Sequence, residues 1–161
     1  MIKKILLYSA IGLFLLSIQG ILGQWLSIQK IKPDFLLILV LYIGQREGKN
    51  FGQLSGFVIG LLADLIGMST FLGLSIFTKV ISGFLAGCLK NQKLKINIFS
   101  YYAFIFVVMF IHNFLFFKIY YHSMNLSFQY MFVRYILPSI LYTSVFYFLF
   151  EFIFARHFQQ R

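Results

Sequence analysis

The chain has 161 residues, of which 60% are hydrophobic and 11% are charged, and its mean hydropathy is +0.86. A soluble domain carries about 25% charged residues, so this chain lacks the polar surface that a water-exposed protein of its size needs. Its 14 Lys and Arg residues against 4 Asp and Glu give a net charge of +10. The basic residues stand between apolar runs, which is typical of membrane proteins that meet anionic headgroups and does not favour a nucleic-acid partner.

The numbers of cysteine and histidine residues limit the disulfides and metal sites that the chain can form. The single cysteine, Cys88, excludes an internal disulfide. One cysteine and three scattered histidines show no spacing that would hold a metal ion. We therefore expect no metal and no cofactor.

The apolar runs predict an all-α, single-domain bundle of six transmembrane helices. A helix needs ~20 residues to cross the membrane, and the length of each run is judged against that number. The expected spans are residues 5–23, 33–45, 51–68, 71–89, 98–121 and 128–154. The first run follows Lys3 and Lys4, so a cleaved signal peptide is the competing interpretation. Its length, and the lack of a small-x-small cleavage site, favour an uncleaved helix.

The second run is short for a membrane span. Pro33 suits the first turn of this helix, where its missing N–H costs nothing. The negative charge of Asp34 interacts favourably with the positive end of the helix dipole. Such a helix either thins the bilayer, lies sheltered among other helices, or extends through its polar flanks.

Loop charge predicts the orientation. With the N-terminus inside, nine basic residues are cytoplasmic and three lie on the opposite side. The cytoplasmic set is Lys3, Lys4, Arg46, Lys49, Lys90, Lys93, Lys95, Arg156 and Arg161; the opposite set is Lys30, Lys32 and Lys118. We therefore expect both termini on the cytoplasmic side of the membrane.

A row of glycines marks the third predicted helix. Gly52, Gly56 and Gly60 recur every four residues, and Asp64 follows one step later. Four residues turn a helix by ~400°, so the row stays on one side, where it lets another helix approach closely within lipid. Further small residues expected to serve packing are Gly67 and Gly73 around the next turn, and Gly83 and Gly87 on the fourth helix, beside Ser82 and Ala86.

Asp64 and Lys79 are the two ionisable residues deepest in apolar sequence. If the turn is centred between residues 71 and 72, both lie near 11 Å from it at ~1.5 Å per residue. A lone charge at such depth costs on the order of 2.5–3.5 kcal/mol, and pairing is the usual remedy. We therefore predict that Asp64 and Lys79 form an intramembrane charge pair.

Other polar residues in the apolar runs favour structural roles. Arg134 can extend its side chain to the outer interface near Tyr130 and Tyr135. His112 and Asn113 lie midway along the fifth run, where a hydrogen-bonded structural histidine is favoured over a proton relay or a hydrolytic dyad. The string GQLSG around Ser55 lacks the glycine that a nucleophile elbow requires, so a membrane hydrolase is not favoured.

Residues 32–73 carry a family resemblance. Lys32 and Pro33 open an apolar helix, and after a basic turn come G-F-x-x-G-x-x-x-D and a glycine-containing turn. These positions are Gly56, Phe57, Gly60, Asp64, Gly67 and Gly73. The stretch resembles the MreD family of rod shape-determining membrane proteins. Lys79 is not part of the family pattern.

The resemblance implies a non-enzymatic scaffold of the bacterial cell-elongation machinery, which supports lateral peptidoglycan synthesis and maintains rod shape. It implies association with the bitopic protein MreC and, through it, with the MreB filament, RodA and a class B penicillin-binding protein. It also implies a fold similar to that of the substrate-binding subunits of energy-coupling-factor transporters. The alternative function is therefore a membrane subunit that binds a small molecule for such a transporter, although the outer loops offer few polar residues.

Overall fold

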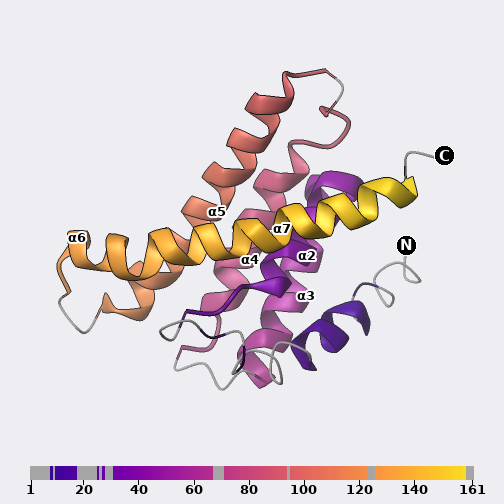
Figure 1. The fold of residues 1–161 in the computed structure, drawn as a ribbon. Coiled ribbons are helices and arrows are strands. Elements are labelled where there is room, and N and C mark those ends of the chain that lie inside the picture. The colour runs from indigo at the N-terminus through magenta and orange to yellow at the C-terminus, as the bar shows by residue number, and fades with distance from the viewer. Residues whose placement is uncertain are drawn as a thin grey trace.

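The computed structural model describes residues 8, 10–17, 25, 27, 31–66, 71–93, 95–122 and 126–158, and the regular elements within them are helices (Figure 1). Their bounds are α2 Phe35–Glu47, α3 Lys49–Ile66, α4 Leu74–Gly87, α5 Ile98–Tyr120, α6 Phe128–Met131, the π-helical segment η2 Phe132–Ile136, and α7 Leu137–Phe158. Residues 10–17 are also helical. The predicted all-α class is confirmed.

The N-terminal helical segment packs on one side of the bundle. Tyr8, Ile11, Leu15 and Leu16 lie against a buried cluster from α2 and α3 that includes Val40 and Ile59. The Tyr8 hydroxyl also donates a 3.1 Å hydrogen bond to Glu47 at the end of α2. The predicted span 5–23 lies partly outside the described residues.

Helix α2 is the central helix of the bundle. Eight of its 13 residues are buried: Leu36, Leu37, Ile38, Leu39, Val40, Leu41, Ile43 and Gly44. A helix of this length is ~20 Å long, well short of the ~30 Å hydrocarbon core. A helix that is apolar on all sides is stable when other helices surround it, and α3, α4 and α7 all pack against α2. Neighbouring helices therefore shelter this short run, and the helix also extends through its polar flank as far as Glu47.

Helices α3 and α4 form the most extensively packed pair. Helix α4 begins at Leu74 rather than at residue 71, because Gly73 is its N-cap with φ +96°. Only glycine adopts that left-handed conformation without strain. Helix α3 is described as far as Ile66, and residues 67–70, including Gly67, lie outside the described residues.

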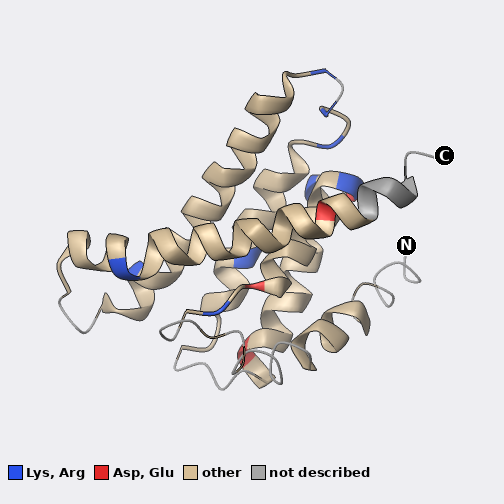
Figure 2. Ribbon diagram, viewed as in Figure 1, with Lys and Arg blue, Asp and Glu red and all other residues tan. Residues whose placement is uncertain are grey.

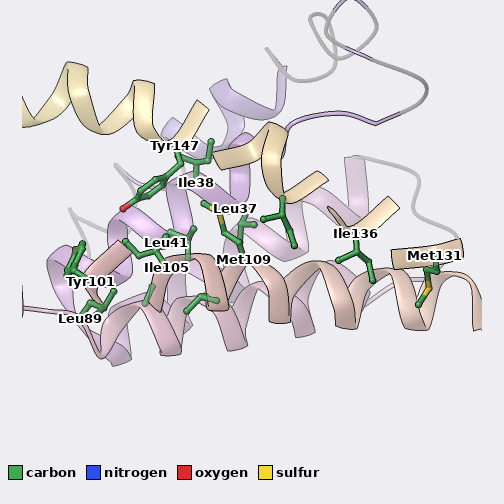
Figure 3. Close-up of a cluster of buried hydrophobic side chains, with 13 residues drawn as sticks. Leu37, Ile38, Leu41, Leu89, Tyr101, Ile105, Met109, Met131, Ile136 and Tyr147 are labelled. Carbon is green, nitrogen blue, oxygen red and sulfur yellow. The ribbon is translucent and has the colours of Figure 1, made fainter. Parts of the chain in front are cut away.

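Helices α5 and α7 are long and aromatic, and with α2 they enclose the main apolar core. Figure 3 shows Leu37 and Leu41 of α2 facing Ile105 and Met109 of α5. Ile136 and Tyr147, from η2 and α7, belong to the same core. This core holds the three elements together.

The sixth predicted run, 128–154, is interrupted by η2. The Leu137 amide donates to the Phe132 carbonyl, five residues back, which is the π-helical pattern. Pro138 follows directly and has no N–H to offer the carbonyl of Arg134, four residues earlier. The proline thus favours the wider π-helical turn. The apolar pattern of the run does not predict this turn.

Charged residues are sparse along the long helices. Lys118 in the last turn of α5 is the one charged residue of that helix, and Figure 2 shows basic residues in the loop that joins α4 and α5. Within the described part of the chain, two helical stretches are long and apolar enough to cross a membrane, Ile98–Tyr120 and Phe128–Ile153.

Candidate functional site

A charged cluster lies between α2, α4 and α5, and it starts at Asp34. Asp34 is the N-cap of α2: its Oδ1 accepts a 2.8 Å hydrogen bond from the Leu37 amide, which satisfies one of the open donors at the helix start. The Asp34 amide in turn donates to Thr143 Oγ1 of α7 at 3.3 Å. Pro33 therefore precedes the cap rather than lying in the first turn, because the Asp34 side chain takes the capping position.

Lys79 of α4 pairs with this capping carboxylate. Its Nζ lies 3.1 Å from Asp34 Oδ2, and the two side chains are 4% and 26% exposed. A buried ammonium needs such a partner, because desolvation without compensation costs several kcal/mol. The pair joins the start of α2 to the middle of α4.

His112 of α5 completes the cluster. Its Nε2 lies 3.5 Å from Asp34 Oδ2, and its Nδ1 lies 3.2 Å from Ser82 Oγ of α4. Ser82 Oγ also donates to the Thr78 carbonyl at 2.7 Å. The four side chains thus form one connected network, Lys79–Asp34–His112–Ser82, which fixes α2, α4 and α5 relative to one another.

The network contains serine, histidine and aspartate in contact, as hydrolases do. Here, however, Ser82 and His112 are 0% and 3% exposed, and the serine sits within α4 on the side that faces the neighbouring helices. Its hydroxyl is already bound to a main-chain carbonyl. The geometry suits a structural polar network, in which each buried group has a partner.

Asp64 has a different partner from the one predicted, and the Asp64–Lys79 pair is corrected on this point. Its carboxylate accepts from the amides of Gly73 (2.8 Å), Ser75 (3.2 Å) and Ile76 (3.4 Å), so it caps the N-terminus of α4. Gly73 has no side chain to perform that role, and the first amides of a helix attract a carboxylate. Matching depth within the hairpin placed Asp64 and Lys79 at the same level, but Asp34 supplies the carboxylate for Lys79.

The glycine row lies where α3 meets α4. A Cβ on Gly60 would come within 2.6 Å of the Ile76 Cα, and one on Gly87 within 2.5 Å of the Lys49 Cα. Added Cβ atoms on Gly52 and Gly56 would collide with the main chain of Gly83 and Lys79, and Gly83 would collide with Gly52 in return. The sequence did not single out Gly44 of α2, whose added Cβ would lie 2.7 Å from the Gly83 carbonyl oxygen.

Gly73 does not belong to this packing set. An added Cβ there meets nothing within 4 Å, and its role is the left-handed backbone conformation at the start of α4. The packing role expected for Gly67 falls outside the described residues.

Two further polar residues that the sequence analysis considered, Asn113 and Ser55, form hydrogen bonds within their own helices. Asn113 donates to the Met109 carbonyl at 2.9 Å, and Ser55 donates to the Gly52 carbonyl at 2.9 Å. Among the described residues, no group of three His, Cys, Asp or Glu side chains is placed to hold a metal ion.

These features define the class as an all-helical protein, built on a glycine-packed helix pair and a buried charge network, with two helical stretches long and apolar enough to cross a membrane. The family model described as rod shape-determining protein MreD matches residues 2–158. The chain belongs to this family of membrane proteins, whose role is in rod shape determination. No curated protein and no solved structure matches the chain.

Proposed function

We propose that this protein is a non-enzymatic, multi-pass scaffold of the bacterial cytoplasmic membrane that supports lateral peptidoglycan synthesis by binding an MreC-like bitopic protein. The family match over residues 2–158 carries the proposal. Through that partner the scaffold connects to the MreB filament, RodA and a class B penicillin-binding protein. The burial of the Ser82 hydroxyl and of His112 within their network supports a structural role for these residues.

Exposed apolar faces supply the surface for lipid and partner helices. Helix α3 presents Phe57, Leu61 and Leu65, which are 48%, 37% and 63% exposed, on the side away from its glycine row. The glycine row holds α3 against α4, so this outer face is rigidly presented. A bitopic partner with one transmembrane helix requires such a face.

The proposed topology has six spans with both termini in the cytoplasm. Asp34, at the start of α2, then lies toward the outer side, together with the Gly73 turn and the network around Lys79. A C-terminal reporter that is active only outside the cytoplasm is expected to stay silent. Activity of that reporter would overturn the topology.

Co-purification tests the function. We expect the full chain, extracted in mild detergent, to co-elute with an MreC-like protein, and we expect Leu61→Arg on the outer face of α3 to weaken that co-elution. Val107→Arg is the matched control, because Val107 is also an exposed apolar residue, at 52%, but lies on a different helix, α5. Stable binding of a vitamin in a thermal-shift screen, with no protein partner, would instead indicate the transporter-subunit function.

A further inference from the structure

The structure contains an apolar groove along α6, η2 and α7 that the charge network and the glycine pair do not use. Its volume is about 690 Å³, within the ~300–1,000 Å³ of ordinary ligand sites. Pro138, Leu141, Tyr142 and Val145 line it along α7, beyond Arg134. Ile31, Tyr130 and Val133 also line the groove.

We propose that this groove binds one anionic phospholipid, with its phosphate at Arg134 and an acyl chain along Pro138, Leu141 and Val145. The inference rests on the membrane placement proposed above. It assigns the site a lipid ligand that the scaffold role does not require.

Charge complementarity identifies the headgroup. The groove is apolar except for the Arg134 guanidinium and the tyrosine hydroxyls. A guanidinium has five donors in a planar fork, so it can bind a phosphate in bidentate fashion while it keeps its contacts within the protein. Tyr130 and Tyr142 place aromatic rings with hydroxyls on the same groove, as residues at a membrane interface do.

The length of the groove fits one leaflet. Arg134 and Val145 are eleven positions apart, which is ~16 Å along a helix, and half of a ~30 Å hydrocarbon core is ~15 Å. A phosphate at Arg134 therefore places the far end of the groove near the bilayer centre. Under the proposed topology this is the outer leaflet.

The backbone explains why the groove starts at this point. Arg134 lies within the π-helical turn, and Pro138 follows one turn later. Such wide turns are frequent at functional sites, because they displace side chains from the regular helical row. An anionic headgroup complements the positive charge of Arg134, which a partner's apolar helix in the same groove would not, so an anionic lipid is the better match.

Native mass spectrometry of the full chain tests the site. The protein is released from micelles after exchange with equal amounts of phosphatidylglycerol and phosphatidylcholine. We expect one retained phosphatidylglycerol, and Arg134→Gln should lower its retention about tenfold, the effect of losing about one charge-assisted contact. Lys118→Gln is the matched charge control: Lys118 is exposed near the same end of the bundle, at the end of α5, and does not line the groove. It should change retention less than about twofold.

A second pair of variants tests the apolar part. Val145→Trp fills the groove and should reduce lipid retention, whereas Val107→Trp on α5 should not; the two positions are 55% and 52% exposed. Arg134→Lys replaces Arg134→Gln where the latter fails to fold, and it should lose part of the preference because it lacks the bidentate fork.

Three results would overturn the proposal. The first is equal retention of the two lipids by the native chain. The second is an equal loss in Arg134→Gln and Lys118→Gln, which would mean a general charge effect. The third is unchanged lipid retention in Val145→Trp together with lost co-elution of a bitopic protein, which would assign the groove to a partner helix. Loss of lipid preference with intact co-elution would leave the scaffold function standing.

Discussion

Double-mutant cycles at the buried charges distinguish the observed ion pair from the pair that the hairpin alone suggests. Lys79 Nζ and Asp34 Oδ2 are 3.1 Å apart, which gives an attraction of about 5 kcal/mol at an effective dielectric of ~20. Desolvation offsets most of it. The Asp34 side chain is 26% exposed, so removing one partner should cost about 3 kcal/mol, at the low end of the range for buried pairs.

The variants are Asp34→Asn, Lys79→Met and their combination. Asparagine is also a good N-cap, so Asp34→Asn removes the charge and keeps the helix start. We expect each single change to destabilise the protein by about 3 kcal/mol and the double to lose about 2 kcal/mol less than the sum, because no buried charge is left unpaired. His112 remains beside Asp34 in Lys79→Met, which limits its cost.

The assay is reversible unfolding in mixed micelles of sodium dodecyl sulfate and dodecyl maltoside, followed by far-ultraviolet circular dichroism. Asp64→Asn and its combination with Lys79→Met form the comparison cycle, whose effects should add within about 0.5 kcal/mol. A coupling of Asp64 with Lys79 as large as that of Asp34 with Lys79 would refute the assignment of partners.

Three further changes probe the rest of the fold. Gly56→Ile should destabilise the α3–α4 pair by at least ~3 kcal/mol, because its Cβ would meet the main chain of Lys79, while Gln53→Ile on the exposed side should change stability by less than ~0.5 kcal/mol in the same unfolding assay. Asp64→Leu should cost about 2 kcal/mol more than Asp64→Asn, because asparagine keeps an acceptor for the α4 amides; equal losses would contradict the capping role. Burial lowers the pKa of Lys93, but the hydrogen bond and charge of Glu151 outweigh it and raise this pKa above its ordinary 10.5. The contribution of this contact to stability is therefore present below pH 10.5 and is lost as the pH rises through the raised pKa, so unfolding curves of the native chain and Lys93→Gln should converge there.

The helices themselves are predictable from the sequence, because each is a continuous apolar run with a recognisable end. The run expected at 98–121 agrees with helix α5, Ile98–Tyr120, and the run expected at 128–154 covers α6, η2 and most of α7. The glycine row lies against α4, as its four-residue spacing indicates. Signals of this kind depend only on residues close together in the sequence, so they can be recognised without knowledge of the tertiary structure.

The partner of Lys79 is not predictable in the same way. Asp34 and Lys79 are 45 positions apart, and their contact depends on α2 lying against α4, which no local pattern encodes. Within the α3–α4 hairpin alone, Asp64 is the carboxylate at the same depth as Lys79. With only four acidic residues in the chain, Asp34 was available as a candidate. The sequence around Asp34 indicates a helix cap next to Pro33, and it gives no local sign that Asp34 also pairs with Lys79.

Depletion of this protein in its own host, with complementation, tests the proposed role as a rod-shape scaffold without catalysis. Cell width and length are measured by microscopy after re-expression of the native chain or of Ser82→Ala, which removes the buried hydroxyl beside His112. Depleted cells should become round, and both forms should restore rods at equal abundance. Depleted cells that remain rod-shaped would contradict a role in rod shape. A Ser82→Ala protein that is stable but leaves cells round would contradict a purely structural role for Ser82.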